Sequence, residues 1–253
     1  MSGNEWLGLE GARAPVSPNH PSPPPLVALI PSPLLGPAVW RPVRTSLCDH
    51  GVDAVAISPA GSTPRTPEDV LNGLLAALPM DRDVALVPHS NAGLYVPELT
   101  RQRPVVGVVF VDAVLPPRQG AVPVAPPPLV ELLEEKAAPD GLLPVWTEWW
   151  DGDEISGLFP CVDVRASVER EQTRLPLSYF TASVKVTAGW DEVPAAYLAF
   201  GETYREERTD AADRGWPVST LPGRHLHMVV EPDCVAAEIS RLLTALGLAK
   251  SRD

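Results

Sequence analysis

The sequence is poor in residues that form disulfides or metal sites. Its three cysteines, Cys48, Cys161 and Cys234, are widely spaced and form no CxxC motif. Such a pattern favours neither a disulfide framework nor a zinc site. Of the histidines only His225 and His227 lie close together, and no glycine-rich phosphate loop is present, so we expect no metal and no cofactor. Few cysteines also favour a reduced, cytoplasmic chain.

Basic side chains and long apolar runs are scarce as well. The chain has 20 Lys and Arg against 32 Asp and Glu, a formal net charge of -12. An acidic protein repels phosphate backbones and anionic lipids, so neither nucleic acid nor a membrane is expected as a partner. No apolar run approaches the roughly 20 residues of a membrane span. The first residues also lack the charged and then apolar pattern of a secretory signal.

What the sequence does contain is enough apolar material for a large core. Of its 253 residues, 45% are apolar, which suits one α/β domain of ordinary size. The prolines of residues 1–24 predict an extended or disordered lead-in. We assign the core to residues 25–114 and 195–253, and the residues between them, 115–194, to a helical cap or lid.

The core assignment rests on an alternation of strands and helices, which favours a mostly parallel sheet with helices on both faces. The cap assignment rests on the break in this alternation, since a long insert in a parallel sheet is usually functional. The expected strands are 26–30, 52–57, 84–87, 105–111, 195–200 and 216–221. The expected helices are 38–50, 66–78, 93–103, 128–137, 162–173, 204–214 and 233–246, with a further short one around Trp146 to Trp150.

One segment carries the chemistry of a nucleophile. In Val87-Pro88-His89-Ser90-Asn91-Ala92-Gly93 a strand turns at once into a helix, which places Ser90 on a strained elbow with its Oγ exposed at the carboxyl edge of the sheet. The helix N-terminus adds positive potential there, and the backbone N–H of Asn91 can stabilise an oxyanion. A serine that only caps the helix is the structural alternative.

This elbow and its C-terminal partner segment resemble the α/β-hydrolase family, although Pro88 and Ala92 replace the two glycines of G-x-S-x-G. The partner segment, Leu221 to Pro232, lies between the last strand and the last helix. The resemblance implies a catalytic histidine in this loop, and His225 has the family's spacing to Pro232. His227 is the alternative candidate for the base, but we expect it to have a structural role or to line the pocket.

The acid of the implied triad has two candidates. Most of the family carries an Asp after the strand expected at 195–200, but Tyr204 takes that position here. Asp112 ends the strand expected at 105–111, and Glu202 ends the strand where the acid usually lies. Either carboxylate can hold the imidazole tautomer, and we favour Asp112.

The oxyanion loop departs from the family as well. With Trp40 as the anchor of the register, the donor position falls on Pro33, which has no N–H. The donor then moves to the Leu34 N–H or to the hydroxyl of Ser32. Because losing one donor costs about 10²–10³ in rate, this departure leaves room for chemistry without a full tetrahedral intermediate.

The aromatic residues of the insert predict the kind of ligand. Trp149 and Trp150 belong to a group that can roof an apolar pocket, although packing of the cap onto the core explains many such residues. We expect a small hydrophobic or polycyclic substrate bound by a monomer or a homodimer.

Three functions follow. The first is a serine hydrolase that cleaves an ester, thioester or lactone. A hydrophobic substrate of this kind fits an enzyme of a natural-product biosynthetic pathway. The second is a lyase or cyclase that acts on a biosynthetic intermediate with the same Ser90 and His225 pair. The third is a binding protein without activity, against which the retention of both residues counts.

Overall fold

The computed structural model describes residues 23–61 and 63–249 of the chain. The lead-in predicted for residues 1–24 lies almost wholly outside these residues. Six strands form one sheet in the order β2-β1-β3-β4-β7-β8, and every neighbouring pair is parallel. The strands of this sheet are β1 (Leu26–Ile30), β2 (Ala54–Ala56), β3 (Val84–Ser90), β4 (Val105–Ala113), β7 (Ala195–Phe200) and β8 (Val218–Leu221). The α/β class predicted from the sequence is therefore confirmed.

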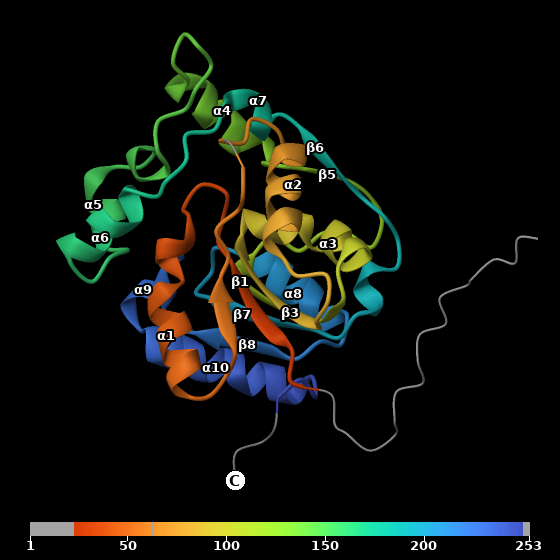
Figure 1. Ribbon diagram of the computed structural model, residues 1–253. Coiled ribbons are helices and arrows are strands. Elements are labelled where there is room, and N and C mark those ends of the chain that lie inside the picture. The colour runs from red at the N-terminus through yellow and green to blue at the C-terminus, as the bar shows by residue number, and fades with distance from the viewer. Residues whose placement is uncertain (1–22, 62, 250–253) are drawn as a thin grey trace, which may run out of the picture.

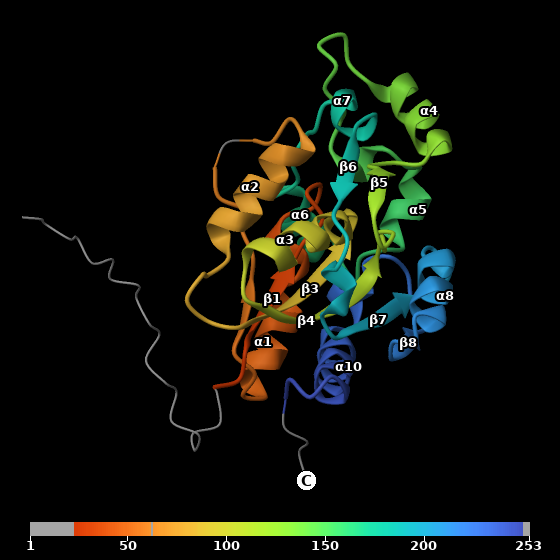
Figure 2. The same cartoon turned by 90° about the vertical axis from the view of Figure 1, so that its right-hand side faces the viewer.

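Helices cover both faces of the sheet. Helix α1 lies along α10, and α2 lies against α3 in a separate layer (Figure 1). The turned view shows α8 beside β7 and β8 at the far edge (Figure 2). The core helices are α1 (Arg41–Asp49), α2 (Pro67–Ala77), α3 (Val96–Gln102), α8 (Arg205–Asp213), α9 (His227–Val230) and α10 (Pro232–Ala245).

The central strands are apolar because both of their faces are covered. Strand β3 is buried along its whole length, as is β7, and such continuous apolar runs are typical of parallel sheets between helix layers.

Helix α2 shows how local hydrogen bonds determine where a helix begins. The Thr66 hydroxyl accepts a hydrogen bond from the Asp69 N–H, and the Asp69 carboxylate accepts one from the Thr66 N–H, so this capping box begins the helix where the sequence predicts.

Several boundaries differ from the sequence prediction, and two of them matter for the site. The helix expected at 38–50 is divided into a 3-10 turn, Pro37–Val39, and α1, which has Pro42 in its first turn where no N–H is needed. The strand expected at 105–111 continues to Ala113. Asp112 thus lies inside β4 with a φ of 41°, at the point where the register between β3 and β4 shifts by one residue.

The insert, residues 115–194, lies between β4 and β7 and contains more than the expected helices. Its N- and C-terminal parts pair as a two-stranded antiparallel sheet, β5 with β6, which was not expected from the sequence. Its described elements are β5 (Gly120–Pro123), α4 (Pro127–Lys136), α5 (Gly152–Ser156), α6 (Val162–Glu169), α7 (Leu177–Phe180) and β6 (Ser183–Val186). Helices α4 and α7 lie at the top of Figure 1, beyond the carboxyl ends of the strands.

Candidate active site

Ser90 lies at the carboxyl end of β3 in a strained turn. Its φ is 58° and its ψ is -130°, and in the described part of the chain only Ser90 and Asp112 have a positive φ without being glycine. A left-handed backbone is costly for residues with a Cβ and is found mostly at functional sites. The chain leaves Ser90 directly into the 3-10 turn Asn91–Tyr95 and then α3. The elbow predicted from the sequence is therefore present in the backbone.

The glycine pattern of the elbow has a steric explanation. A Cβ on Gly93 would lie 2.0 Å from the carbonyl oxygen of Val114, so the first turn after Ser90 passes directly over the end of β4. The close approach falls at position 93, where the sequence has its glycine, and Ala92 is accommodated one place earlier as a fully buried residue.

Ser90, His225 and Asp112 form a continuous hydrogen-bonded chain. His225 Nδ1 lies 2.7 Å from Asp112 Oδ2, and His225 Nε2 lies 3.1 Å from Ser90 Oγ. Because an ionised carboxylate only accepts, Nδ1–H donates to Asp112, and Nε2 is free to accept the Ser90 proton. This is the arrangement that a serine nucleophile and its general base require.

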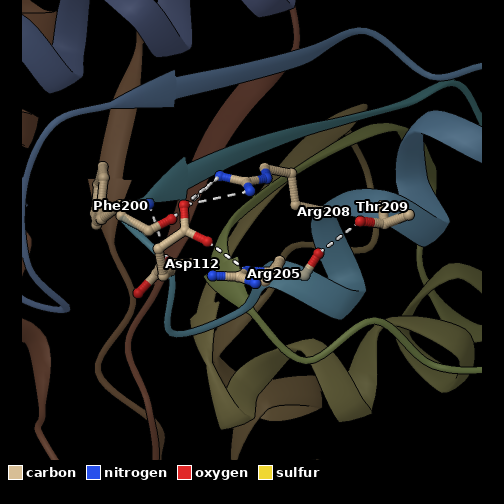
Figure 3. A network of polar contacts seen from close by, with 7 residues as sticks. Asp112, Phe200, Arg205, Arg208 and Thr209 are labelled. Atoms are coloured by element: carbon tan, nitrogen blue, oxygen red, sulfur yellow. Dashed lines mark hydrogen bonds and ion pairs between the residues drawn. The ribbon is translucent and has the colours of Figure 1, made fainter.

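Asp112 is held in place by more than His225. Its side chain is completely buried, and its Oδ1 accepts a hydrogen bond of 3.0 Å from the Phe200 N–H at the end of β7 (Figure 3). A buried carboxylate is stable only when it is hydrogen-bonded or paired, and both oxygens of Asp112 have a partner.

Glu202, the second acid candidate, lies in a different environment. Its carboxylate pairs with Arg205 and Arg208, and its side chain is 58% exposed. Both arginines belong to α8, and their side chains extend toward the turn between β7 and α8 (Figure 3). The hydrogen bond from Arg205, together with the positive charge of both arginines, lowers the pKa of Glu202. Glu202 is one of the residues that line the cavity above Ser90, whereas the carboxylate in contact with the imidazole is that of Asp112.

His89 contacts His225 through a hydrogen bond and through its ring. It is fully buried, its Nε2–H donates to the His225 carbonyl oxygen at 3.0 Å, and the two rings lie 4.5 Å apart. Burial, together with the neighbouring His225, lowers the pKa of His89 well below its ordinary value, so the ring is neutral at physiological pH. The sequence analysis assigned no role to this residue, although its place next to Ser90 in β3 is a usable signal.

The sequence offers three oxyanion donors, the N–H groups of Asn91 and Leu34 and the hydroxyl of Ser32. Asn91 begins a helical turn, so its N–H has no acceptor within that turn. The Leu34 N–H has only a long contact of 3.5 Å to Ser32 Oγ, and Leu34 lines the cavity. Ser32 itself is buried and does not belong to the cavity wall. Of the two candidates that could replace Pro33, only the Leu34 N–H thus belongs to a residue that lines this cavity.

The side chain of Asn91 connects the elbow to the insert. Its Nδ2 donates to the Val124 carbonyl at 3.1 Å, and its Oδ1 accepts from the Tyr179 hydroxyl. The Tyr179 oxygen in turn lies 2.7 Å from that of Tyr95 in the core. We call these two hydrogen bonds of the Asn91 side chain, to Val124 and Tyr179, the Asn91 clamp. Because Tyr179 is far from Asn91 in the sequence, no local pattern could have predicted it.

A cavity of about 840 Å³ opens above Ser90. Its wall combines side chains of the insert with Ser90, Asn91 and His225 from the core. Its apolar lining consists largely of Leu129, Trp146, Trp149, Trp150, Ile155, Leu158 and Phe180. Both predicted tryptophans thus line the cavity, whereas His227 packs against Phe200 at a ring distance of 5.5 Å and is not part of this wall.

Charged groups are few in the cavity and are mostly acidic. Three carboxylates, those of Glu154, Glu202 and Glu207, face one guanidinium, that of Arg224. Partial burial raises the pKa of Glu207.

No group of three or more His, Cys, Asp or Glu side chains suited to a metal ion occurs among the described residues. Over the same residues, no helix has the length and apolar character needed to cross a membrane.

Solved structures with this fold are similar to the chain over most of its length. An extracellular α/β-hydrolase from a Paenibacillus species superposes with a TM-score of 0.69 at 16% identity, covering 87% of this chain and 99% of its own. Tomato methylketone synthase I in complex with 2-tridecanone gives 0.69 at 13% identity, with coverages of 88% and 99%. Polyneuridine aldehyde esterase gives 0.62 at 18% identity, again with coverages of 88% and 99%.

The sequence itself matches no protein-family model and no curated protein. The structural likeness, together with the sheet order and the elbow, shows that the chain has the α/β-hydrolase fold. This is the fold that the resemblance of the elbow and the His225 loop predicted.

Proposed function

We propose that the protein is a serine hydrolase that cleaves an ester of a small hydrophobic substrate. The observation that carries the proposal is the hydrogen-bonded chain from Asp112 through His225 to Ser90, which ends at the floor of an apolar cavity. Ser90 Oγ attacks the carbonyl carbon while its proton passes to His225 Nε2. Asp112 stabilises the imidazolium, and the N–H groups of Leu34 and Asn91 bind the oxyanion.

The lining supports an uncharged substrate. A cavity of about 840 Å³ is within the usual range for small-molecule sites of about 300–1,000 Å³. Tryptophans of the insert supply apolar area, and a wall with more carboxylates than cations disfavours an anionic substrate. In this proposal the insert acts as a cap. The complex of tomato methylketone synthase I with 2-tridecanone is consistent with apolar ligands on this fold.

A second candidate is a lyase or cyclase that uses the same pair of residues on a biosynthetic intermediate. The observation that favours it is Pro33, which removes one N–H from the oxyanion loop. In such a reaction His225 and Ser90 would transfer protons without an acyl-enzyme.

A fluorophosphonate probe tests the hydrolase candidate, because it reacts readily with an activated serine nucleophile. We expect one adduct on Ser90, located by peptide mass spectrometry. The adduct should be absent in Ser90→Ala, strongly reduced in His225→Ala, and unchanged in the distant control Ser240→Ala on α10. Turnover of p-nitrophenyl esters should follow the same order. An unlabelled Ser90, with a ligand that co-purifies in the cavity, would show that Ser90 is not an activated nucleophile and would favour the second candidate.

A further inference from the structure

The Ser90 hydroxyl has a second side-chain partner besides the histidine. The Tyr204 hydroxyl lies 3.3 Å from Ser90 Oγ, and the Tyr204 ring lies 5.6 Å from that of His225. Tyr204 immediately precedes α8, after the end of β7. This is the place where the family resemblance implies an aspartate, and the triad as built from Asp112 leaves the tyrosine without a role.

The direction of the proton in this contact follows from the rest of the chain of hydrogen bonds. Because His225 Nδ1–H donates to Asp112, its Nε2 accepts the Ser90 proton. Ser90 Oγ therefore accepts from the Tyr204 O–H. Burial raises the pKa of Tyr204 above its ordinary value, so the phenol keeps its proton at physiological pH.

The sheet order separates this hydroxyl from the oxyanion donors. Leu34 follows β1, on one side of β3 and its elbow. Tyr204 follows β7, and His225 follows β8, both on the other side. A substrate carbonyl held by the Leu34 and Asn91 N–H groups thus directs its leaving group toward the side that His225 and Tyr204 share.

We propose, on the basis of the serine hydrolase function above, that Tyr204 is a catalytic residue whose hydroxyl donates a hydrogen bond to the leaving-group oxygen. Ser90 Oγ forms the bond to the carbonyl carbon, and its proton moves to His225. As the tetrahedral intermediate collapses, the bond from carbon to the leaving oxygen breaks. That oxygen takes the proton from His225, while Tyr204 keeps its own proton and stabilises the developing alkoxide.

The test compares two esters of one acid in the Tyr204→Phe variant. An alkyl leaving group depends on hydrogen bonding because its alkoxide is strongly basic, whereas p-nitrophenolate is stable without it. We expect kcat/KM, which reports the acylation step, to fall about 10- to 100-fold for the ethyl ester and less than about threefold for the p-nitrophenyl ester. The matched control Tyr95→Phe, which removes another buried hydroxyl, should leave the ratio of the two rates unchanged.

Labelling of Ser90 keeps the two proposals distinguishable. Tyr204→Phe should react with the fluorophosphonate within about threefold of the wild-type rate, which also shows that its site is folded. Equal losses on both esters, or no loss on either, would overturn the role of Tyr204 while the hydrolase function stands. A wild-type protein whose Ser90 is not labelled would overturn the hydrolase function and, with it, the role of Tyr204.

Discussion

The Asp112 carboxylate reaches His225 Nδ1 at 2.7 Å from a backbone in the left-handed region. Ser90 is the other non-glycine residue with a positive φ in the described part of the chain, and it lies in the neighbouring strand, paired with Ala113. Both ends of the hydrogen-bonded chain through His225 are therefore held by locally unfavourable backbone. Such conformations persist only where the surrounding structure over-determines them, here through the buried strands β3 and β4.

The acid of the proposed triad is tested by comparing Asp112→Asn with Glu202→Gln. An amide at 112 disturbs the tautomer of His225, so kcat should fall by up to about 10⁴-fold. Glu202→Gln removes only exposed ion pairs, which contribute about 0–1 kcal/mol, and kcat should change less than about threefold. Steady-state kinetics of both variants measure the difference. The reverse order of effects would move the acid to the turn after β7.

The oxyanion loop is tested by Ser32→Ala. If the Leu34 N–H is the donor, this change removes only a long contact of 3.5 Å and should lower kcat less than about threefold. A loss of about 10²–10³ would instead identify the Ser32 hydroxyl as the donor. Thermal unfolding of the variant distinguishes a lost donor from a damaged fold.

The clamp on Asn91 is tested by Tyr179→Phe. The change leaves the Asn91 amide oxygen without its buried donor, so the free energy of unfolding should fall by about 1–3 kcal/mol. The turn that carries the Asn91 N–H also loses a contact to the insert, so we expect kcat to fall about tenfold with little change in KM. Chemical denaturation and steady-state kinetics check the two effects, and a normal kcat in a destabilised variant would limit Tyr179 to a structural role.

The elbow is tested by Gly93→Ala. The added Cβ would lie 2.0 Å from the Val114 carbonyl oxygen, so β4 and the turn must separate. We expect a loss of about 1–3 kcal/mol or more in the free energy of unfolding, together with a strong loss of Ser90 labelling. Gly152→Ala is the matched control, because a Cβ there meets nothing within 4 Å. Equal stability of the two variants would contradict the close approach.

The pH dependence of stability tests the neutral state of His89. Its pKa is lowered in the folded protein, so below about pH 6.5 the unfolded chain binds a proton that the native state does not. Stability is therefore retained above pH 6.5 and falls as the pH drops through 6.5 toward 5. In His89→Gln this slope should be smaller by up to about 1.4 kcal/mol per pH unit. Urea unfolding between pH 5 and 7.5 measures the slope, and an unchanged slope would mean that the pKa of His89 is the same in the folded and unfolded states.

Local patterns in the sequence were sufficient for the fold class and for most helices and strands of the core. Apolar runs such as Leu26–Ile30 and the capping residues around Thr66 act within a few positions of the chain, so they can be recognised without tertiary structure. The elbow at Ser90 is also local, because a strand, a turn and a helix follow one another directly. The two-stranded sheet of β5 and β6 was not predicted, because its strands lie at opposite ends of the insert in the sequence.

The candidate site depended on contacts between distant segments. From the sequence alone, Asp112 and Glu202 both end strands at the same edge of the sheet, and only the fold shows that Asp112 contacts His225 while Glu202 pairs with arginines of α8. The Tyr204 hydroxyl beside Ser90 and the Tyr179 clamp on Asn91 join residues that no short-range pattern relates. The sequence by itself thus determined the parallel α/β class from periodicity and the nucleophile candidate from the turn at Ser90, while His225 followed from the resemblance of its loop to the α/β-hydrolase family. The tertiary structure decided their partners, because hydrogen bonds depend on the positions and directions of side chains brought together by folding.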